Sequence, residues 1–307
     1  MRYYQLILMT ISETGNSLTV SELCRATGVT RSAYYNWLST KELREEKEKR
    51  DLEDFLLILE AYQFRGYDKG VWGVHMRLLR MGVRMNHKKI RRLMRKYDLR
   101  CPIRQANPDR QIMKELRTSA VADNKLKREF KEHGARMILL TDITYIPLNS
   151  CFCYLSVIID ACTMEVLSYV LSGSLKVDFV LMTVRILLRD HGDELKTNVL
   201  LHSDQGAHYT SHSFRDLLSE QSLRQSMSRK GNCWDNAPQE SFFGHMKDEL
   251  GIHSRSWNTI EEARAAIDDW MDYYNKDRYQ RGLQKMAPTE YYQYLVTGKY
   301  PESMHLM

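Results

Sequence analysis

The chain has 307 residues and a formal net charge of +6, with 45 Lys and Arg against 39 Asp and Glu. This length suits two or three domains with a substantial core. No apolar run approaches the roughly 18 uncharged residues of a membrane span, no secretory leader is visible, and the six cysteines form no CxxC pair. These features exclude a membrane protein and a disulfide-rich secreted domain, so we expect reduced thiols in a cytoplasm.

Charge is divided unevenly along the chain. Residues 1–130 hold 27 Lys and Arg against 16 Asp and Glu, whereas residues 131–307 hold 18 against 23. Between Lys69 and Arg104, twelve basic residues face one acid, Asp98. Such a density neutralises phosphates and releases counterions, so we expect the N-terminal half to bind DNA in a salt-sensitive way.

The first predicted unit is a helix-turn-helix at residues 17–38. Apolar residues line its first helix, Gly28 permits the tight turn, and Thr30 caps the second helix. The outward face of the second helix carries the residues that we expect to contact base edges, which are Arg31, Ser32, Tyr35 and Asn36. The alternative is a purely structural helical hairpin without a DNA role.

A second helix-turn-helix is predicted after a charged helical connector. A helical pattern at 70–81 precedes an amphipathic helix at 86–97, whose buried stripe is Ile90, Leu93, Met94 and Tyr97. The basic residues expected to face DNA are Lys88, Arg91, Arg92 and Arg95. A generic charged surface helix is the alternative reading of this pattern.

An α/β domain is predicted after a proline-containing linker. Strand-like runs occur at about 136–146, 151–160, 164–172 and 197–203, with a short strand at 224–227 and helical patterns near 176–190 and 211–220. A final helix at 259–275 has an acidic first turn and one apolar face, which is typical of a docking helix.

Three acids lie in distinctive settings within this domain. Asp142 shares one strand face with apolar residues, Asp204 ends an apolar strand, and Glu240 follows 36 positions later on a helix. Singly, each acid could cap a helix or accept backbone hydrogen bonds. Three converging carboxylates would repel one another, and a divalent cation such as Mg²⁺ or Mn²⁺ would remove that conflict.

The residues around these acids carry a family resemblance. Segments 141–145, 202–211 and 228–243 closely resemble the three catalytic blocks of DDE transposases related to retroviral integrases, and more narrowly the OrfB-type protein of the bacterial insertion-sequence-three family. The resemblance implies a ribonuclease-H-like core, a five-stranded mixed sheet with flanking helices. It also implies that Asp142, Asp204 and Glu240 are catalytic and hold two Mg²⁺ (or Mn²⁺) ions per active site.

Other residues of these blocks are expected near DNA. Lys247 stands seven positions after Glu240, so both share one helix face, although a solvated lysine is the alternative. The further expected DNA contacts are Gln205, His208, Tyr209, Lys230, Asn232, Trp234, Asn236, Asn275 and Arg278. Helix termini explain Asn236, Asn275 and Arg278 about as well. The chain departs from the family pattern at Leu139 and Gln239, where tryptophan and methionine are common, without changing a metal ligand.

The resemblance implies a transposase of the bacterial cytoplasm, associated with the nucleoid. It would bind the terminal inverted repeats of an insertion sequence and catalyse Mg-dependent 3′-end nicking and strand transfer. Double-stranded DNA, as element ends and target, would be its partner, with no nucleotide cofactor and no membrane. Because two ends must be held together, we expect a homo-oligomer, at least a dimer. A ribonuclease-H-type hydrolase and a non-enzymatic DNA-binding regulator are the alternatives.

The expected domain division follows these patterns. It comprises an N-terminal helix-turn-helix at 1–40, a connector at 41–60, a basic helix-turn-helix at 61–100, a linker at 101–130, the catalytic core at 131–255 and a C-terminal helical extension at 256–307.

Overall fold

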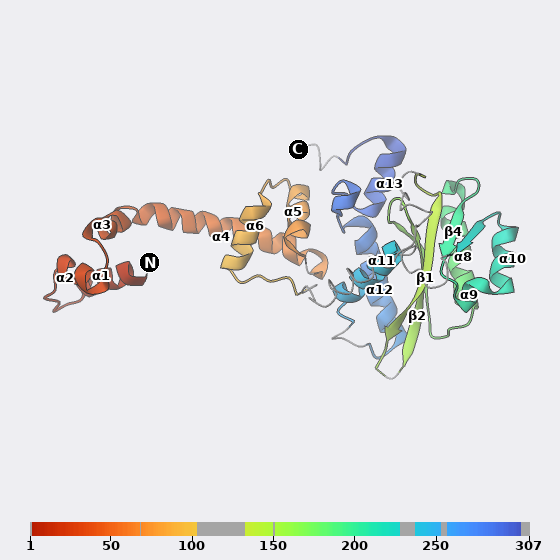
Figure 1. Cartoon of the computed structure of the whole chain (residues 1–307), viewed down its shortest axis with the longest axis horizontal. Coiled ribbons are helices and arrows are strands. Elements are labelled where there is room, and N and C mark those ends of the chain that lie inside the picture. The colour runs from red at the N-terminus through yellow and green to blue at the C-terminus, as the bar shows by residue number, and fades with distance from the viewer. Residues whose placement is uncertain are drawn as a thin grey trace, which may run out of the picture.

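The computed structural model shows an elongated molecule, with small helical units at the N-terminal end and a sheet domain at the other (Figure 1). The structure describes residues 2–67, 69–102, 133–149, 151–227, 237–252 and 257–301. No helix within these ranges is long and apolar enough to cross a membrane.

The N-terminal unit consists of α1 (Arg2–Ser12), α2 (Val20–Thr27) and α3 (Arg31–Ser39) around a small apolar core. The Thr19 side chain accepts from the Glu22 amide in a capping box, and Gly28 ends α2 in the left-handed region at φ 69°. The Thr30 side chain caps α3, as the sequence predicted. The helices of the first predicted helix-turn-helix are therefore confirmed, while α1 was not predicted.

The second helical unit is built from α4 (Lys41–Gln63), the 3-10 helix η1 (Phe64–Gly66), α5 (Val71–Arg80) and α6 (His87–Lys96). The predicted stripe of α6 is buried, and it packs against the second half of α4 through Ile58 and Ala61. The first half of α4 bridges to the N-terminal unit (Figure 1). The boundary expected at residue 60 thus falls inside a packed helix.

The sheet is mixed and five-stranded, in the order β3-β2-β1-β4-β5. Its strands are β1 (Ile138–Pro147), β2 (Phe152–Asp160), β3 (Val166–Ser172), β4 (Leu200–Ser203) and β5 (Arg224–Met227). The first three strands pair antiparallel, whereas β4 pairs parallel with β1 and with β5. The fold class and the five strands expected from the sequence are confirmed.

Helices cover both faces of the sheet (Figure 1). One core contains Leu139 and residues of α8 (Asp178–His191) and α10 (His212–Glu220), with the short α9 (Ala207–Thr210) beside them. The other contains Leu140 and residues of α11 (Ala237–Glu249) and α12 (Ile260–Lys276). The chain continues through the 3-10 helix η4 (Arg281–Leu283) to α13 (Pro288–Thr297). Alternate residues of β1 therefore serve opposite cores.

A buried arginine fastens the start of β1 to its surroundings. Arg136 is 1% exposed, and its guanidinium contacts Glu165 at 2.8 Å, Glu194 at 3.0 Å and Asp160 at 3.6 Å. The guanidinium also stacks on the ring of Tyr292 in α13 at 3.9 Å. Because ions are buried at a large desolvation cost, this network depends on all its members being present.

Candidate active site

Asp142 lies in the middle of β1, opposite Val157 of β2, and is only partly buried. Its Oδ1 accepts a hydrogen bond from the Ile143 amide at 2.7 Å. Burial is the largest of the effects that together raise the pKa of Asp142 to about 7. The negative charges of Asp204 and Glu240 also raise it, while the hydrogen bond from the Ile143 amide and the charge of Lys247 lower it. The structure therefore brings the three predicted acids and the predicted lysine into one electrostatic field.

Asp204 follows β4 and is exposed. Leu140 of β1 pairs with His202 of β4, so Asp142 and Asp204 each stand two positions further along parallel strands. Oδ1 of Asp204 accepts from the Gly206 amide at 2.9 Å. A Cβ at position 206 would stand 2.9 Å from that oxygen, so only glycine fits this turn without displacing the carboxylate.

Glu240 and Lys247 come from α11, which covers the sheet face shared by Asp142. Glu240 lies exposed in its first turn, where a carboxylate is favoured by the helix dipole. Burial lowers the pKa of Lys247, and Asp142 raises it. Phe242, Phe243 and Met246 hold the helix against the sheet from the other side. The helix face predicted to carry Glu240 and Lys247 together is thus directed toward Asp142.

The donor chemistry of this cluster fits a hard divalent cation. Oxygen-only ligands suit Mg²⁺ or Mn²⁺, and Asp142 is a largely desolvated carboxylate that also lies within the negative field of Asp204 and Glu240. Across the described ranges, however, no three His, Cys, Asp or Glu side chains already stand as a group able to hold a metal ion. Binding would therefore require the carboxylates to draw together.

Three expected DNA contacts after Asp204 have different surroundings. Gln205 is exposed, and His208 is half-buried with its Nε2 2.7 Å from the Leu175 carbonyl oxygen. Tyr209 is 1% exposed and packs against Phe214, so its expected contact with DNA is corrected. Its hydroxyl lies 3.4 Å from that of Thr141, where it supports the strand that carries Asp142.

The two C-terminal residues expected at DNA are structural. The Asn275 side chain donates to the carbonyl of Val166 and accepts from its amide, both at 2.9 Å, which joins α12 to β3. Arg278 forms an ion pair with Glu249 at 2.7 Å and contacts His245 at 2.9 Å. Both side chains are used inside the protein, so their expected DNA contacts are corrected. Lys230, Asn232, Trp234 and Asn236 lie outside the described residues.

The residues expected to read DNA on α3 are available to a partner. Arg31, Ser32, Tyr35 and Asn36 are all exposed, and Tyr35 is 48% exposed. They follow the Thr30 cap at the start of a helix whose Tyr34 is buried in the small core. This arrangement agrees with the outward face predicted for the second helix of the unit.

The basic residues of α6 fall into two sets. Arg92 meets Asp51 of α4 in a bidentate pair at 2.7 Å, and Lys96 contacts Asp51 at 2.9 Å and Glu48 at 2.6 Å. Lys89 pairs with Asp54. These contacts hold the pKa of Asp51 well below its usual range. Arg92 is therefore paired with α4, although its side chain is 47% exposed, and its expected role at DNA stays a prediction.

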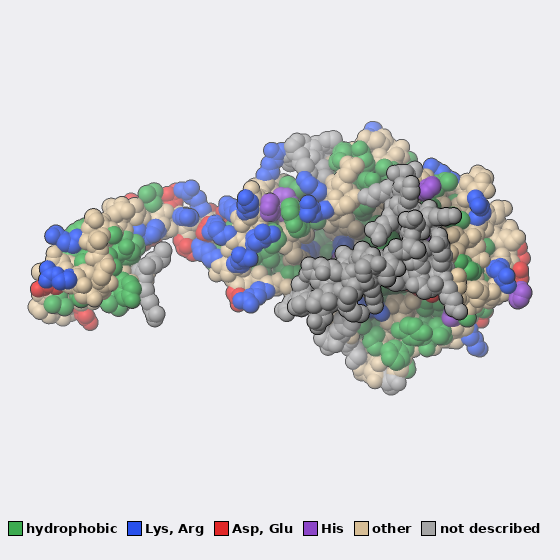
Figure 2. All heavy atoms as spheres, in the orientation of Figure 1, with side chains coloured by type: hydrophobic (Ala, Val, Ile, Leu, Met, Phe, Trp, Pro, Cys, Tyr) green, Lys and Arg blue, Asp and Glu red, His purple; other side chains and the backbone are tan. Residues whose placement is uncertain are grey.

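The remaining cations of α6 form a free basic face, defined as Lys88, Arg91 and Arg95. All three are exposed, and none forms an ion pair with the residues that the structure describes. Lys and Arg side chains gather over the surface of the α5 and α6 region in Figure 2. Sequence periodicity separated the buried stripe from the polar faces but carried no signal of the acids on α4.

Comparisons with known proteins agree with this arrangement. Residues 132–233 and 221–288 match two families described as Integrase core domain, and residues 49–107 match an HTH-like domain. One relative is a protein of Escherichia coli (strain K12) named as the transposase InsK of insertion sequence element IS150. The two sequences are 34% identical over 274 residues, which is 89% of this chain and 93% of that protein. The chain belongs to the insertion-sequence-three family of DDE transposases.

Other similarities extend across the same regions. The transposase for insertion sequence element IS629 of Shigella sonnei is 27% identical over 88% of this chain and 90% of its own. Among solved structures, the catalytic core domain of BIV integrase aligns with a TM-score of 0.41 and 20% identity, over 54% of this chain and 99% of that one. The catalytic domain of Mos1 mariner transposase aligns at 0.42 and 19% identity, over 65% and 99%. This DDE transposase is thus a polynucleotidyl transferase.

Proposed function

We propose that this transposase binds the terminal inverted repeats of its insertion sequence, nicks the 3′ ends and joins them to a target phosphodiester. Asp142, Asp204 and Glu240 are proposed to hold two Mg²⁺ (or Mn²⁺) ions. The observation that carries the proposal is the placement of the three acids: Asp142 lies in β1, Asp204 follows the parallel neighbour β4, and Glu240 lies in the first turn of α11, with the charges of both other acids acting on Asp142. When bound, such ions activate a nucleophile and stabilise the leaving oxygen at phosphorus.

The protein's own residues prepare the site for this chemistry. The sheet holds Asp142 and Asp204 on neighbouring parallel strands, and the Gly206 turn orients the second carboxylate. Lys247 is placed to bind a phosphate oxygen beside the acids, because its ammonium is half-buried and lies within the field of Asp142. Its position would keep the scissile phosphate near the carboxylates.

DNA binding is proposed for two separate helices. The exposed residues of α3 are suited to base edges, and the free basic face of α6 is suited to the phosphate backbone. We further propose that the chain acts in the domains expected from the sequence, except that the second half of α4 belongs to the second helical unit. At least two copies are proposed to assemble, because joining requires two element ends.

A strand-transfer assay tests this function. A labelled oligonucleotide carrying the element end is incubated with the protein and Mg²⁺, and nicked and joined products are resolved. We expect both products, and we expect Asp204→Asn to abolish them while the exposed Asp216→Asn on α10, a matched acid-to-amide change outside the site, retains them. Hydrolysis of an RNA–DNA hybrid without joining would favour a ribonuclease instead, and metal-independent DNA binding alone would favour a regulator.

A further inference from the structure

The basic helical unit is attached to the catalytic domain at a contact that the sequence did not indicate. Arg65 of η1 lies at φ 60°, and its guanidinium contacts Asp272 at 3.0 Å, Asp269 at 3.2 Å and Asp277 at 3.6 Å. These acids belong to α12 and its C-terminal end. The neighbouring Tyr67 donates its hydroxyl proton to Asp269 at 2.6 Å. One end of the unit is thus held by several charged and polar contacts.

A second anchor lies at the other end of α5. Arg80 has a side chain only 4% exposed, contacts Glu290 of α13 at 2.5 Å and stacks on the ring of Tyr279 at 4.7 Å. Between the two anchors, the guanidinium of Arg281 covers the ring of Trp72 at 4.3 Å. We call these contacts, made by Arg65, Tyr67, Trp72 and Arg80 with α12, η4 and α13, the seam.

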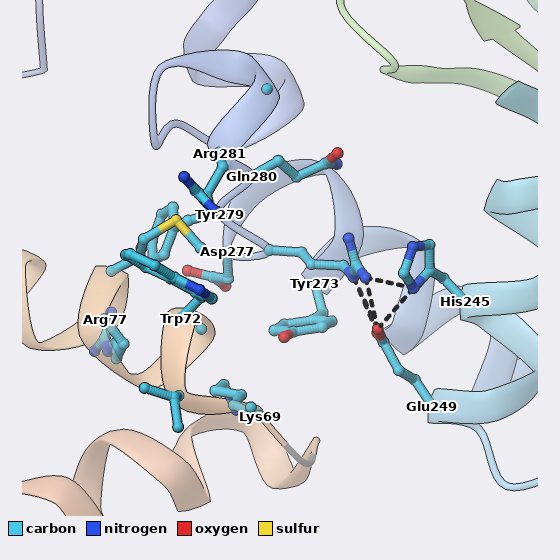
Figure 3. Close-up of a pocket in the computed structure, with 16 residues that line it drawn as sticks. Lys69, Trp72, Arg77, His245, Glu249, Tyr273, Asp277, Tyr279, Gln280 and Arg281 are labelled. Atoms are coloured by element: carbon cyan, nitrogen blue, oxygen red, sulfur yellow. Dashed lines mark hydrogen bonds and ion pairs between the residues drawn. The ribbon is translucent and has the colours of Figure 1, made fainter. Parts of the chain in front are cut away.

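A cavity of ≈ 560 Å³ lies along the seam, and its lining includes Trp72, Tyr279 and Arg281. Figure 3 shows Trp72 and Arg77 on one side of it, and Tyr273, Asp277 and Arg281 on the other. One anchor precedes α5 and the other is its last residue, so the two anchors lie at opposite ends of that helix. Anchors at both ends of α5 resist rotation as well as separation, which a single contact would not do.

Packed cores continue from the seam in both directions. The helix α5 shares its core with α6, through Leu78 and Leu93. The helix α12 shares its core with β1, through Trp270 and Leu140. A rigid path therefore leads from the free basic face of α6, across the seam, to the strand that carries Asp142.

We propose that the seam acts as a ruler, which holds DNA bound on α6 at a fixed distance from Asp142 and so selects the phosphodiester that is cut. The inference rests on the proposed function of the two sites. Arg65 and Arg80 are then positioning residues that determine cleavage specificity without touching DNA. If the seam only stabilised the fold, loosening it would lower the amount of active protein but leave the position of the cut unchanged.

The test is the double variant Arg65→Gln/Arg80→Gln, compared with Arg185→Gln/Arg189→Gln on α8. Both changes remove two positive charges, and the control arginines are exposed. Cleavage of an end-labelled oligonucleotide is mapped at nucleotide resolution, together with end-binding affinity. We expect a single cut from the wild type and the control, and cuts spread over neighbouring phosphodiesters from the seam variant at an affinity within about twofold of wild type. A single unshifted cut from the seam variant would overturn the proposal that the seam determines the position of the cut.

Two further measurements separate this result from folding and from the proposed function. Tyr67→Phe keeps the ring that stacks on Tyr273 but removes the bond to Asp269, so it should give a smaller spread without loss of folded protein. Small-angle scattering of the full chain without DNA needs no catalysis. We expect a larger radius of gyration for the seam double variant than for its control, and equal radii would refute the seam as a rigid joint even if the wild type cuts no DNA.

Discussion

Replacing Asp142 by asparagine should stabilise the metal-free protein at high pH while abolishing strand transfer. The pKa of Asp142 is about 7 in the folded chain against an ordinary value of 3.8. The folded chain therefore binds this proton more tightly than the unfolded chain. The free energy of unfolding falls as pH rises from about 4 to about 7 and then stays at its lower value.

The size of the stabilisation follows from the difference between the pKa values of Asp142 in the folded and unfolded chains. About three pKa units separate the two states, and each unit corresponds to about 1.4 kcal/mol, so ionised Asp142 costs about 4 kcal/mol at pH 8. Asparagine has no charge to bury, and its side-chain oxygen can still accept from the Ile143 amide. For a domain of this size, the gain corresponds to a rise in Tm of about 10 °C.

The assay is thermal unfolding of wild type and Asp142→Asn in EDTA at several pH values. The stability difference should be about 2 kcal/mol at pH 5 and about 4 kcal/mol at pH 8. The Asp216→Asn control should change little at either pH, since that side chain is exposed. Mg²⁺ should stabilise the wild type more than the variant, because a cation relieves the same repulsion. A variant no more stable than wild type at pH 8, or a difference independent of pH, would refute this reasoning.

Four other substitutions test three separate parts of the structure. Arg91→Gln should reduce the slope of log affinity for DNA against log salt by about 0.9. Arg92→Gln leaves Asp51 with Lys96 as its partner and should change stability more than the slope. Equal slopes for the two variants in fluorescence anisotropy would contradict the division of α6. Gln239→Met should raise the free energy of unfolding by about 1 kcal/mol, because the buried Oε1 of Gln239 has no hydrogen-bond partner among the residues that the structure describes. A lower free energy of unfolding in urea would contradict this. Arg136→Met should lower the free energy of unfolding by about 3–5 kcal/mol in the same assay, because buried acids are left unpaired. A decrease below about 1 kcal/mol would show that the network is not cooperative.

Local rules explain why so much of the fold could be predicted from the sequence. Thr19, Gly28 and Thr30 act within one turn of their own helices, so their caps are visible in the sequence. The period of two in β1 places Leu139 and Leu140 in opposite cores. Local rules predicted the elements that carry Asp142, Asp204 and Glu240, whereas the grouping of these acids into one site was implied by the family resemblance.

The errors concern pairings between elements that are distant in sequence. Periodicity assigned Arg92 to a polar face, but only the packing of α4 on α6 decides that Asp51 occupies it. Tyr209 and Asn275 were read from their neighbours in the chain, whereas their contacts are with Thr141 and Val166. A polar side chain in a sequence motif therefore suggests a contact with a ligand, but the structure can show instead that the side chain binds another part of the protein.

The distribution of arginine distinguishes structural acids from the proposed catalytic ones. Arg65 forms ion pairs with the acids of the seam, Arg278 with Glu249, and Arg136 with acids near β1 such as Glu165. Asp142, Asp204 and Glu240 have no ion pair in the described part of the chain, and the field of Lys247 only partly offsets their charge. Because an arginine there would cancel the attraction for a divalent cation, the protein keeps these acids unpaired and accepts the lower stability that Asp142→Asn would reveal.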